Sequence, residues 1–279
     1  MYLSSRTEVA PTRCIFTFRD KKYDILVPGS QSVLVELPVS GEGEKISLTL
    51  DFPELEQKMK VGYVIPEIVT VPKISKAFPI DGTPEKWKKY PALAFASSEL
   101  IYPIDVFGWH GKDDLSVRLN LAHDGTHFYL FAAVKDDHHC NKHPSGDIAK
   151  GDIFQIAFDP KTNSYGLKKD QKMPDDTNMA LALSAGRVIP VFYYGVDRQL
   201  FAKSNCAVRR DEKSKTTFYE WKIPLTSLGL DWKKEHVFGF SGVVFDDDSN
   251  TRWDYYMDLY PGITRKFDPS RFGLFVLQK

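Results

Sequence analysis

The sequence predicts an all-β protein, an antiparallel β-sandwich preceded by a small β-sandwich-like domain. Apolar and polar residues alternate with a period of two in many short segments, and turn residues separate these segments. No long segment has the 3.6-residue apolar period of an amphipathic helix. Many short strands with frequent turn signals are typical of a sandwich.

Residues 1–74 are predicted to form the small β domain. Its strand candidates are CIFTF, YDILV, SVLVEL and KISLTL, separated by turn residues. The segment PELEQKMK is expected to form two helical turns, because Pro53 fits the first position of a helix. The proline-rich segment VIPEIVTVPKISKAFP is expected to be an extended connector or an edge strand, which places a domain boundary near residue 75.

Residues 75–279 are predicted to form the larger sandwich. The segment LSVRLNLAHDGTHFYLFAAVKDD predicts a hairpin that turns at Asp124-Gly125. Its second strand is apolar on both faces and is therefore expected to be central and covered on both sides. Further strand candidates are DIFQIAFD, NMALALS, RVIPVFYY, TTFYEWKIP, VFGFSGVVFDD and FGLFVLQ.

Composition narrows the function classes. The chain has 37 Lys+Arg and 37 Asp+Glu, so its formal net charge of zero gives no reason to expect a nucleic acid or an anionic membrane as partner. No apolar segment reaches the length of about 18 residues that a membrane span needs. The N-terminus lacks the pattern of a signal peptide. Cys14, Cys140 and Cys206 permit at most one disulfide and are equally compatible with three free thiols.

The segment DDDSNT is a candidate metal loop. Asp246, Asp248 and Asn250 alternate as in an EF-hand, and Ca²⁺ prefers such oxygen ligands. However, Thr251 stands at the sixth position in place of Gly, and Met257 at the twelfth in place of Glu. An EF-hand is excluded, a different calcium loop stays open, and a polar turn whose Asp side chains accept backbone N–H groups is favoured.

The loop KDDHHCNKHPSGDIAKGD carries a second set of possible metal ligands. Its members are Asp136, Asp137, His139, Cys140, His143 and Asp147. Two histidines four residues apart converge on zinc when they lie on a helix, but Pro144 and Gly146 predict a loop. The sequence therefore favours a polar loop over a zinc site.

Aromatic residues near turns are candidates for stacking on a sugar ring. They are Trp109, Trp253, Tyr255, Tyr256 and Tyr260. Strict alternation would place Trp253, Tyr255 and Met257 on one face of a strand and Arg252 on the other. Among catalytic signatures, the sequence has no G-x-S-x-G, no H-E-x-x-H and no phosphate loop.

Residues 75–279 resemble the family 9 carbohydrate-binding modules and their DOMON-like relatives. The segments that carry the resemblance, in order, are FPIDGTPEKW, WHGKDDLSVRLNLAHDGTHFYLFAAVKDD, GDIFQIAFD, FYEWKIPLTSLGL, FGFSGVVFDDDSNTRWDYYMDLYPG and DPSRFGLFVL. The resemblance implies a β-sandwich that binds sugars, often at chain ends, and that frequently holds structural Ca²⁺. Such modules commonly accompany polysaccharide-degrading enzymes and are not themselves catalytic.

The resemblance also implies a site in which two aromatic residues enclose a sugar ring. Trp253 matches one of them, whereas the loop that should supply the other, HHCNKHPSGDIAK, has no Trp, Tyr or Phe. His139 or His143 would then replace the second wall. The remaining residues expected at the sugar are Arg252, Asp137, Asn178, Tyr255 and Trp109.

We therefore expect a non-catalytic protein that binds a poly- or oligosaccharide. We expect it to be an accessory region of a larger polysaccharide-processing protein, next to a catalytic domain. The resemblance implies an extracellular or periplasmic location and a structural calcium ion. Three alternatives stay open. They are a purely structural docking domain, a glycan-active enzyme, and a haem protein that uses Met257 and a loop histidine as axial ligands.

Overall fold

The computed structural model describes residues 2–4, 11–18, 21–27, 32–34, 37, 45–64, 67–102, 109–143, 146–164, 173–195, 205–234, 237–264 and 266–279. The chain forms two compact units, Met1–Glu67 and Ile68–Lys279. The division falls after Glu67 and not after residue 74, because β7 (Ile68–Val71) pairs with β19 (Gly273–Leu277) of the second unit.

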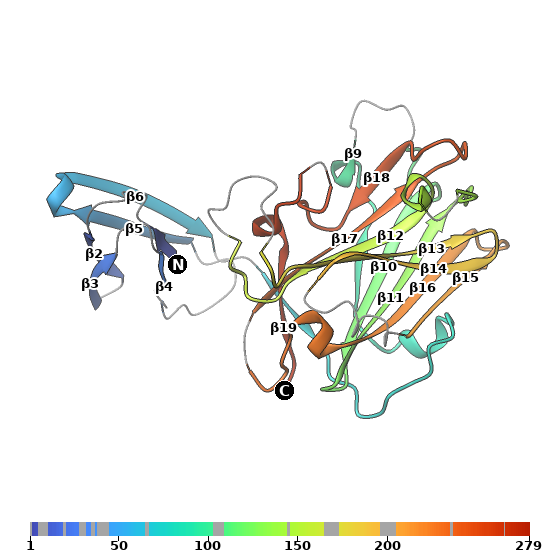
Figure 1. Ribbon diagram of the computed structural model, residues 1–279, viewed down its shortest axis with the longest axis horizontal. Helices are drawn as coiled ribbons and strands as arrows, with labels where there is room; N and C mark the ends of the chain where they lie inside the picture. The colour runs from blue at the N-terminus through green and yellow to red at the C-terminus, as the bar shows by residue number, and fades with distance from the viewer. Residues whose placement is uncertain are drawn as a thin grey trace. The chain divides into compact units, whose positions relative to one another are not determined.

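The first unit contains a four-stranded and a two-stranded sheet (Figure 1). The larger sheet has the order β3 (Lys21–Val27), β2 (Thr12–Phe18), β5 (Lys45–Phe52) and β6 (Gln57–Val64), and β1 (Tyr2–Ser4) pairs with β4 (Ser32–Leu34). The predicted helix at residues 53–60 is wrong. Only η1 (Pro53–Leu55) is helical, and Glu56 adopts a left-handed conformation that turns the chain back into β6. The core of the larger sheet is formed by Cys14, Phe16, Phe18, Leu48 and Leu50, among others.

The second unit is a β-sandwich, as predicted. One sheet has the order β15 (Asn205–Asp211), β16 (Thr216–Pro224), β11 (His127–Asp136), β10 (Leu115–His123) and β8 (Ala92–Phe95). The hairpin is confirmed, since Leu115 pairs with Asp136 and the strands continue in register to the turn. Gly125 has a φ of 86°, a conformation that glycine adopts without strain.

The other sheet has eight strands. Its main order is β14 (Arg187–Tyr194), β13 (Thr177–Ser184), β12 (Ile153–Asp159), β17 (Phe238–Asp246), β18 (Tyr255–Asp258) and β9 (Ile101–Tyr102). Strand β19 pairs with β17, and β7 pairs with β19 in parallel. The predicted edge strand within residues 64–79 is therefore present as β7.

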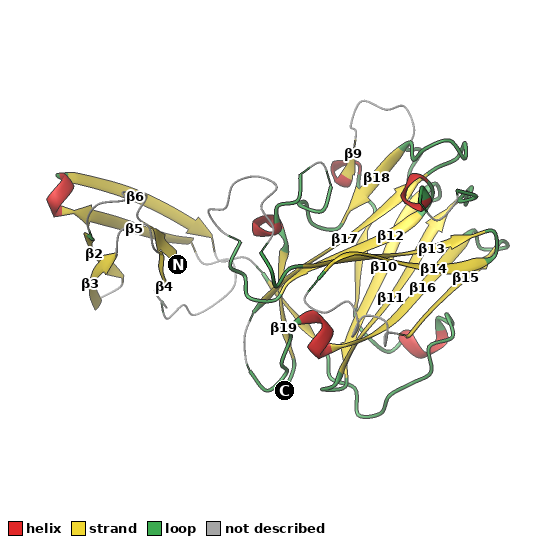
Figure 2. Ribbon diagram, in the orientation of Figure 1, coloured by secondary structure: helices red, strands yellow, loops and turns green. Residues whose placement is uncertain are grey.

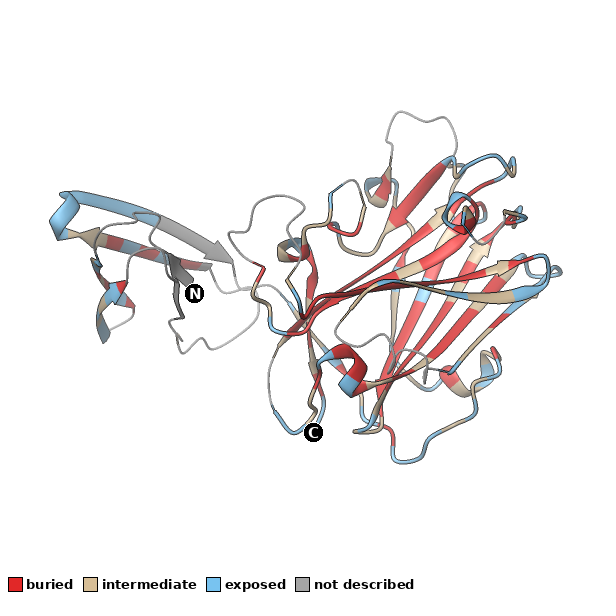
Figure 3. Ribbon diagram, viewed as in Figure 1, coloured by how far each residue is buried: buried red, intermediate tan, exposed pale blue. Residues whose placement is uncertain are grey.

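The two sheets lie face to face with the core between them (Figure 2). Alternate residues of each strand point into this core, so that Leu119, Leu130, Phe154, Leu181 and Phe240 are fully buried. Buried positions recur along every central strand (Figure 3). The intervening residues of each strand lie on the outer face of their sheet.

Residues 74–90 cover the outer face of the five-stranded sheet. Trp87, in η2 (Glu85–Trp87), is stacked on Phe131 with ring centroids 5.5 Å apart. The buried Glu220 carboxylate of β16 holds this cover. It accepts hydrogen bonds from Asp81 N, Gly82 N, Lys86 Nζ and Trp87 Nε1 at 2.8–3.0 Å.

The helices that the structure describes are single 3₁₀ turns of three or four residues. They are η1, η2, η3 (Ser98–Leu100), η4 (Ile148–Lys150), η5 (Leu225–Leu228) and η6 (Pro269–Arg271). Within the described residues, no helix is long and apolar enough to cross a membrane. Cys14, Cys140 and Cys206 are free thiols, so the alternative of one disulfide does not hold.

Candidate functional site

At one end of the sandwich, three aspartates occupy positions that, by the alternation of their strands, point toward the core. Asp136 follows Val134 in β11, Asp246 follows Val244 in β17, and Asp152 precedes Phe154 in β12. All three are at most 3% exposed. The apolar core therefore ends in a layer of buried carboxylates, which a protein compensates by a proton, a cation or hydrogen bonds.

Asp246 is the most strongly perturbed of these groups. Burial, together with the neighbouring charges of Asp152 and Asp136, raises the pKa of Asp246 to about 10. Burial and the proximity of Asp246 also raise the pKa of the Tyr255 phenol. At neutral pH and without a bound cation, Asp246 is thus a neutral acid.

His139 and His143 lie inside the polar end and not on a sugar-facing surface. His139 Nδ1 is 3.0 Å from Asp152 Oδ2, and His143 Nε2 is 3.3 Å from Asp247 Oδ2. Their side chains are 10% and 11% exposed. Burial opposes protonation of His139, but the Asp136 and Asp152 carboxylates raise its pKa to about 10. Neither imidazole offers a free face that could replace an aromatic wall.

The predicted calcium ligands do not converge as a set. Asp248 Oδ belongs to a group with Asp114 and Asp137 whose ligand atoms lie within 4.8 Å of one another, and Asp246 belongs to a different, buried layer. Asn250 Oδ1 accepts a hydrogen bond from Lys142 N at 2.9 Å. An acid-rich group that could hold a hard cation is therefore present. It combines Asp248 with Asp114, just before β10, and Asp137, just after β11, rather than with residues of its own loop.

The DDDSNT segment itself is a polar turn. Asp247 Oδ1 accepts hydrogen bonds from Ser249 N and Ser249 Oγ, at 3.0 and 3.2 Å. Asp248 N donates to Asp254 Oδ2 at 3.2 Å. These contacts agree with the interpretation of the segment as a turn in which Asp side chains accept from the backbone.

The outer face of the eight-stranded sheet carries a pair of amide side chains. Gln155 of β12 donates from Nε2 to Asn178 Oδ1 of β13 at 2.8 Å. Both residues point away from the core, because their neighbours Phe154, Ile156 and Met179 fill it. The pair fixes two planar amides side by side, and the Gln155 Oε1 acceptor and the Asn178 Nδ2 donors are not used in this bond.

An aromatic wall lies on the same outer face. The Trp253 ring contacts Phe245 and Tyr256, with centroids 5.6 and 5.7 Å apart. The Arg252 guanidinium lies 4.7 Å from the Trp253 ring centroid. Val243, which pairs with Gln155 across the sheet, belongs to the same apolar cluster as Trp253. The face thus joins an indole, a cation and two amides.

Strict alternation assigned Trp253 to the wrong face. Strand β18 begins at Tyr255, and Trp253 lies before it in a bend whose N–H donates to Lys150 O at 2.5 Å. Trp253 therefore packs with Tyr256 on the outer face, while Tyr255 is 1% exposed and faces the core. This burial takes Tyr255 out of the proposed sugar contacts.

Two other predicted residues also lie away from this face. Trp109 packs against the core and its Nε1 donates to Leu115 O at 2.9 Å. Asp137 is exposed, but its carboxylate lies with Asp114 and Asp248 at the acidic end. Of the predicted residues, Arg252 and Trp253 lie together on this outer face, and Asn178 lies on the same face but is only 5% exposed.

Sequence reasoning missed Gln155, Asp114 and Asp152. Gln155 could have been found as the one polar side chain at an outward position of the otherwise apolar strand IFQIAF. Asp152 could have been found by continuing the alternation of inward-facing residues to the position just before β12. Asp114 meets Asp248 only through the tertiary fold, so no local pattern indicates it.

Comparisons with known proteins place the chain in a family. The sequence matches the family described as "Carbohydrate family 9 binding domain-like" over residues 80–279. Two similar solved structures are of a carbohydrate binding module family 9 from Caldicellulosiruptor kristjanssonii, in complex with cellotriose and with glucose. Both have a TM-score of 0.58 and cover 76% of this chain. The cellotriose complex is 15% identical and covered to 94%, and the glucose complex is 16% identical and covered to 96%. No curated protein matches the chain.

Proposed function

The chain belongs to the carbohydrate family 9 binding domain-like family, and from this premise we propose that it binds carbohydrate through the outer face of the eight-stranded sheet. The observation that carries the proposal is the presence on one face of the Arg252–Trp253 wall and the Gln155–Asn178 amide pair. The proposed action is binding without catalysis. Similar modules were solved with cellotriose and glucose, which supports glucose-containing oligosaccharides as the first ligands to test.

The chemistry of the face suits a sugar. The C–H face of a pyranose packs on an indole, and amide and guanidinium groups form directional hydrogen bonds with hydroxyls. The wall is one-sided, because both loop histidines are buried against aspartate side chains. Binding with a single aromatic wall has a smaller contact area than a two-sided enclosure, so we expect an affinity in the range of about 10 µM to 1 mM.

The test compares two tryptophans that each carry a cation over the ring. Trp253 lies beneath Arg252, and Trp232 lies beneath Lys73 with Nζ 3.8 Å from the ring centroid. Wild type is screened on a glycan array, and the affinity of Trp253→Ala and Trp232→Ala for a bound glycan is then measured by calorimetry. We expect Trp253→Ala to weaken binding about 10-fold, or about 1.4 kcal/mol, and Trp232→Ala to bind as wild type. Equal affinity of the Trp253 variant, or no ligand on the array, contradicts the proposal.

We further propose that Ca²⁺ binds to the group Asp114, Asp137 and Asp248. Carboxylate oxygens are suitable ligands, and burial together with Asp137 and Asp114 raises the pKa of Asp248, as expected for acids without a shared cation. Ca²⁺ should raise the melting temperature of wild type but not that of Asp248→Asn. Asp147→Asn, an exposed acid paired with Lys150, serves as the control and should respond as wild type. If Ca²⁺ raises the melting temperature of Asp248→Asn as much as that of wild type, this site is contradicted.

The wider context is also a proposal. An accessory role in a larger polysaccharide-processing protein, with a neighbouring catalytic domain and an extracellular or periplasmic location, agrees with a binding module. A docking role predicts that Trp253 becomes protected from solvent when a partner domain is present and that no glycan competes. Solvent accessibility of Trp253, followed by fluorescence quenching with and without glycan, separates the two functions.

A further inference from the structure

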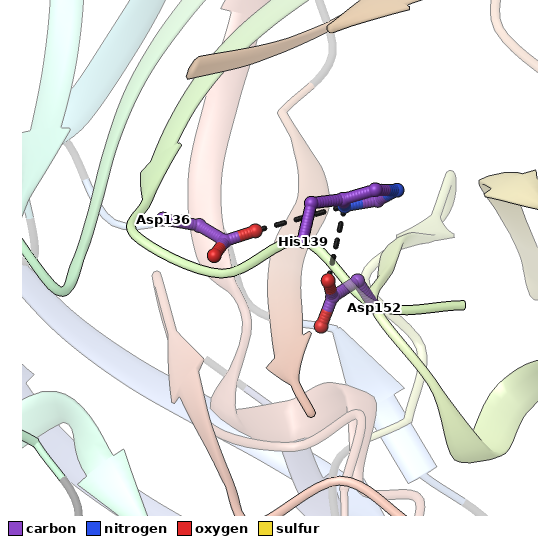
Figure 4. A group of neighbouring side chains, drawn as sticks. All are labelled: Asp136, His139 and Asp152. Carbon is purple, nitrogen blue, oxygen red and sulfur yellow. Dashed lines mark ion pairs between the residues drawn. The ribbon is translucent and has the colours of Figure 1, made fainter. Parts of the chain in front are cut away.

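Asp136, His139 and Asp152 form a buried group at the end of the sandwich where β11 ends and β12 begins (Figure 4). His139 Nδ1 lies 3.0 Å from Asp152 Oδ2 and 3.6 Å from Asp136 Oδ2. The side chains of the three residues are between 3% and 10% exposed. One nitrogen and two oxygens thus meet in a site largely closed to solvent.

The protonation of the His139 ring is fixed from its other side. Nε2 lies 3.1 Å from the carbonyl oxygen of Leu183, which can only accept, so Nε2 carries a hydrogen. Nδ1 then points between the two carboxylates. Among the described residues Nδ1 has no well-formed hydrogen bond, although Asp152 Oδ2 is within range. A ring nitrogen held in this way by a backbone carbonyl is the arrangement that orients a metal-binding imidazole.

The two carboxylates are oriented by hydrogen bonds to their Oδ1 atoms. His138 N donates to Asp136 Oδ1 at 2.7 Å, and Asp247 N donates to Asp152 Oδ1 at 2.7 Å. These bonds turn the Oδ2 atom of each aspartate toward His139. Two further groups reach the Oδ2 atoms, since Cys140 N donates to that of Asp152 and Arg210 Nη1 lies 3.5 Å from that of Asp136.

The separations are compatible with ligand atoms around a metal ion as well as with an ion pair. Ligand bonds of about 2.0–2.1 Å in a tetrahedron place neighbouring ligand atoms about 3.3 Å apart. The two distances from Nδ1, 3.0 and 3.6 Å, lie on either side of this value. Ca²⁺ prefers a shell of oxygens, whereas Zn²⁺ and related ions accept imidazole with carboxylates.

We propose that Asp136 Oδ2, His139 Nδ1 and Asp152 Oδ2 bind one transition-metal ion of the Zn²⁺ class, separately from any Ca²⁺ at Asp114, Asp137 and Asp248. The ion joins the end of β11 to the start of β12 and so closes the loop between them. That loop also supplies Lys150 O, which accepts the hydrogen bond from Trp253 N. The metal therefore has a structural role behind the proposed sugar-binding face.

The experiment uses the full chain after treatment with a chelator and dialysis. Zn²⁺ is titrated by calorimetry in the presence of excess Ca²⁺, which occupies oxygen-only sites. We expect one Zn²⁺ per chain for wild type. His139→Gln should lower the affinity more than about 100-fold, because changes outside the ligand shell alone cost 10–100-fold. His138→Gln is the matched control, since this neighbouring imidazole is 63% exposed and faces Asp248. It should bind Zn²⁺ as wild type.

Co²⁺ gives a readout that needs no variant. A four-coordinate Co²⁺ site with nitrogen and oxygen ligands absorbs visible light much more strongly than hydrated Co²⁺, and Zn²⁺ should abolish the absorption. Failure of wild type to bind Zn²⁺ under excess Ca²⁺, weak octahedral-type Co²⁺ absorption, or equal binding by His139→Gln would each overturn the proposal. His139 would then be an imidazolium ion between two aspartates. If His139→Gln does not fold, the Co²⁺ spectrum of wild type decides alone.

Discussion

A chain segment covers part of the outer face of each sheet, and the two faces differ in the polar groups that lie beside the cover. Both faces carry aromatic residues on their central strands, with Phe131 and Phe218 on one sheet and Phe245 and Tyr256 on the other. On the five-stranded sheet, residues 74–90 lie over these side chains and Glu220 secures them with four donors. On the eight-stranded sheet, Ile263 and Phe272 pack with Val243 and Tyr256. The paired Gln155 and Asn178 amides lie on the same face. The comparison shows that aromatic side chains alone do not identify a ligand-binding face. What distinguishes the two faces is whether the neighbouring polar side chains are already bonded to a covering segment.

The carboxylate anchors of the two sheets differ in the same way. Glu220 is fully buried, accepts hydrogen bonds from several donors and is ion-paired with Lys86 at 3.0 Å. Asp176, at the start of the strand that carries Asn178, accepts from Met173 N at 2.9 Å through one oxygen. Its other oxygen, Oδ1, is buried and has no partner within the described residues. The cover of the five-stranded sheet is thus held by a carboxylate with several donors. The proposed binding face lies next to a carboxylate with one bonded oxygen among the described residues.

The largest effect is expected from Glu220→Ala. The change leaves buried N–H groups of the cover without an acceptor and the Lys86 ammonium without its partner, so the free energy of unfolding of the second unit should fall by about 3–5 kcal/mol. Urea unfolding followed by Trp fluorescence measures the loss. Glu212→Ala removes an acid that is 70% exposed in the turn between β15 and β16 and should have little effect. Similar stability of the Glu220 variant and wild type would show that the cover does not depend on this anchor.

A smaller effect, with a sign that depends on pH, is expected from Asp176. Burial raises the pKa of Asp176 from 3.8 to about 7, so the folded state keeps a proton that the unfolded state releases in this range. The free energy of unfolding contributed by Asp176 therefore falls as pH rises from about 4 to about 7. Asp176→Asn removes this fall, so its stability relative to wild type should increase between pH 4.5 and pH 7.5. A constant difference between Asp176→Asn and wild type over this pH range would contradict the raised pKa of Asp176.

The smallest effect is expected from Arg252→Ala. Loss of one hydrogen bond from the exposed Arg252 guanidinium to a sugar hydroxyl costs about 0.7 kcal/mol, so glycan affinity should fall about threefold, less than for Trp253→Ala. Arg209→Ala is the control on the other sheet, where this exposed arginine lies beside Gly82 of the cover. Calorimetry with the same glycan distinguishes the two variants. A loss of affinity with Arg209→Ala and none with Arg252→Ala would indicate that the glycan binds on the five-stranded sheet instead.

Much of the fold could be predicted from local patterns, because strand alternation and turn chemistry act over a few residues. The hairpin at Gly125 and the doubly covered strand β11 are examples. The helix expected at residues 53–60 failed because pairing with β5 outweighs a weak helical preference. The site was less predictable, since it depends on where strands begin. The predicted face of Trp253 was wrong because β18 begins two residues later, at Tyr255, so strand alternation does not apply to Trp253.

The most direct measurement follows side-chain amides by NMR while a glycan from the array is added. Gln155 and Asn178 report on the outer face of the eight-stranded sheet. Asn120 reports on the other sheet, where its Nδ2 donates to Tyr90 O and Pro91 O and where it lines a hollow of about 290 Å³ beside Trp87. We predict that the side-chain NH₂ signals of Gln155 and Asn178 shift with the glycan and that those of Asn120 do not. A shift confined to Asn120, or no shift at either face, would contradict carbohydrate binding on the eight-stranded sheet.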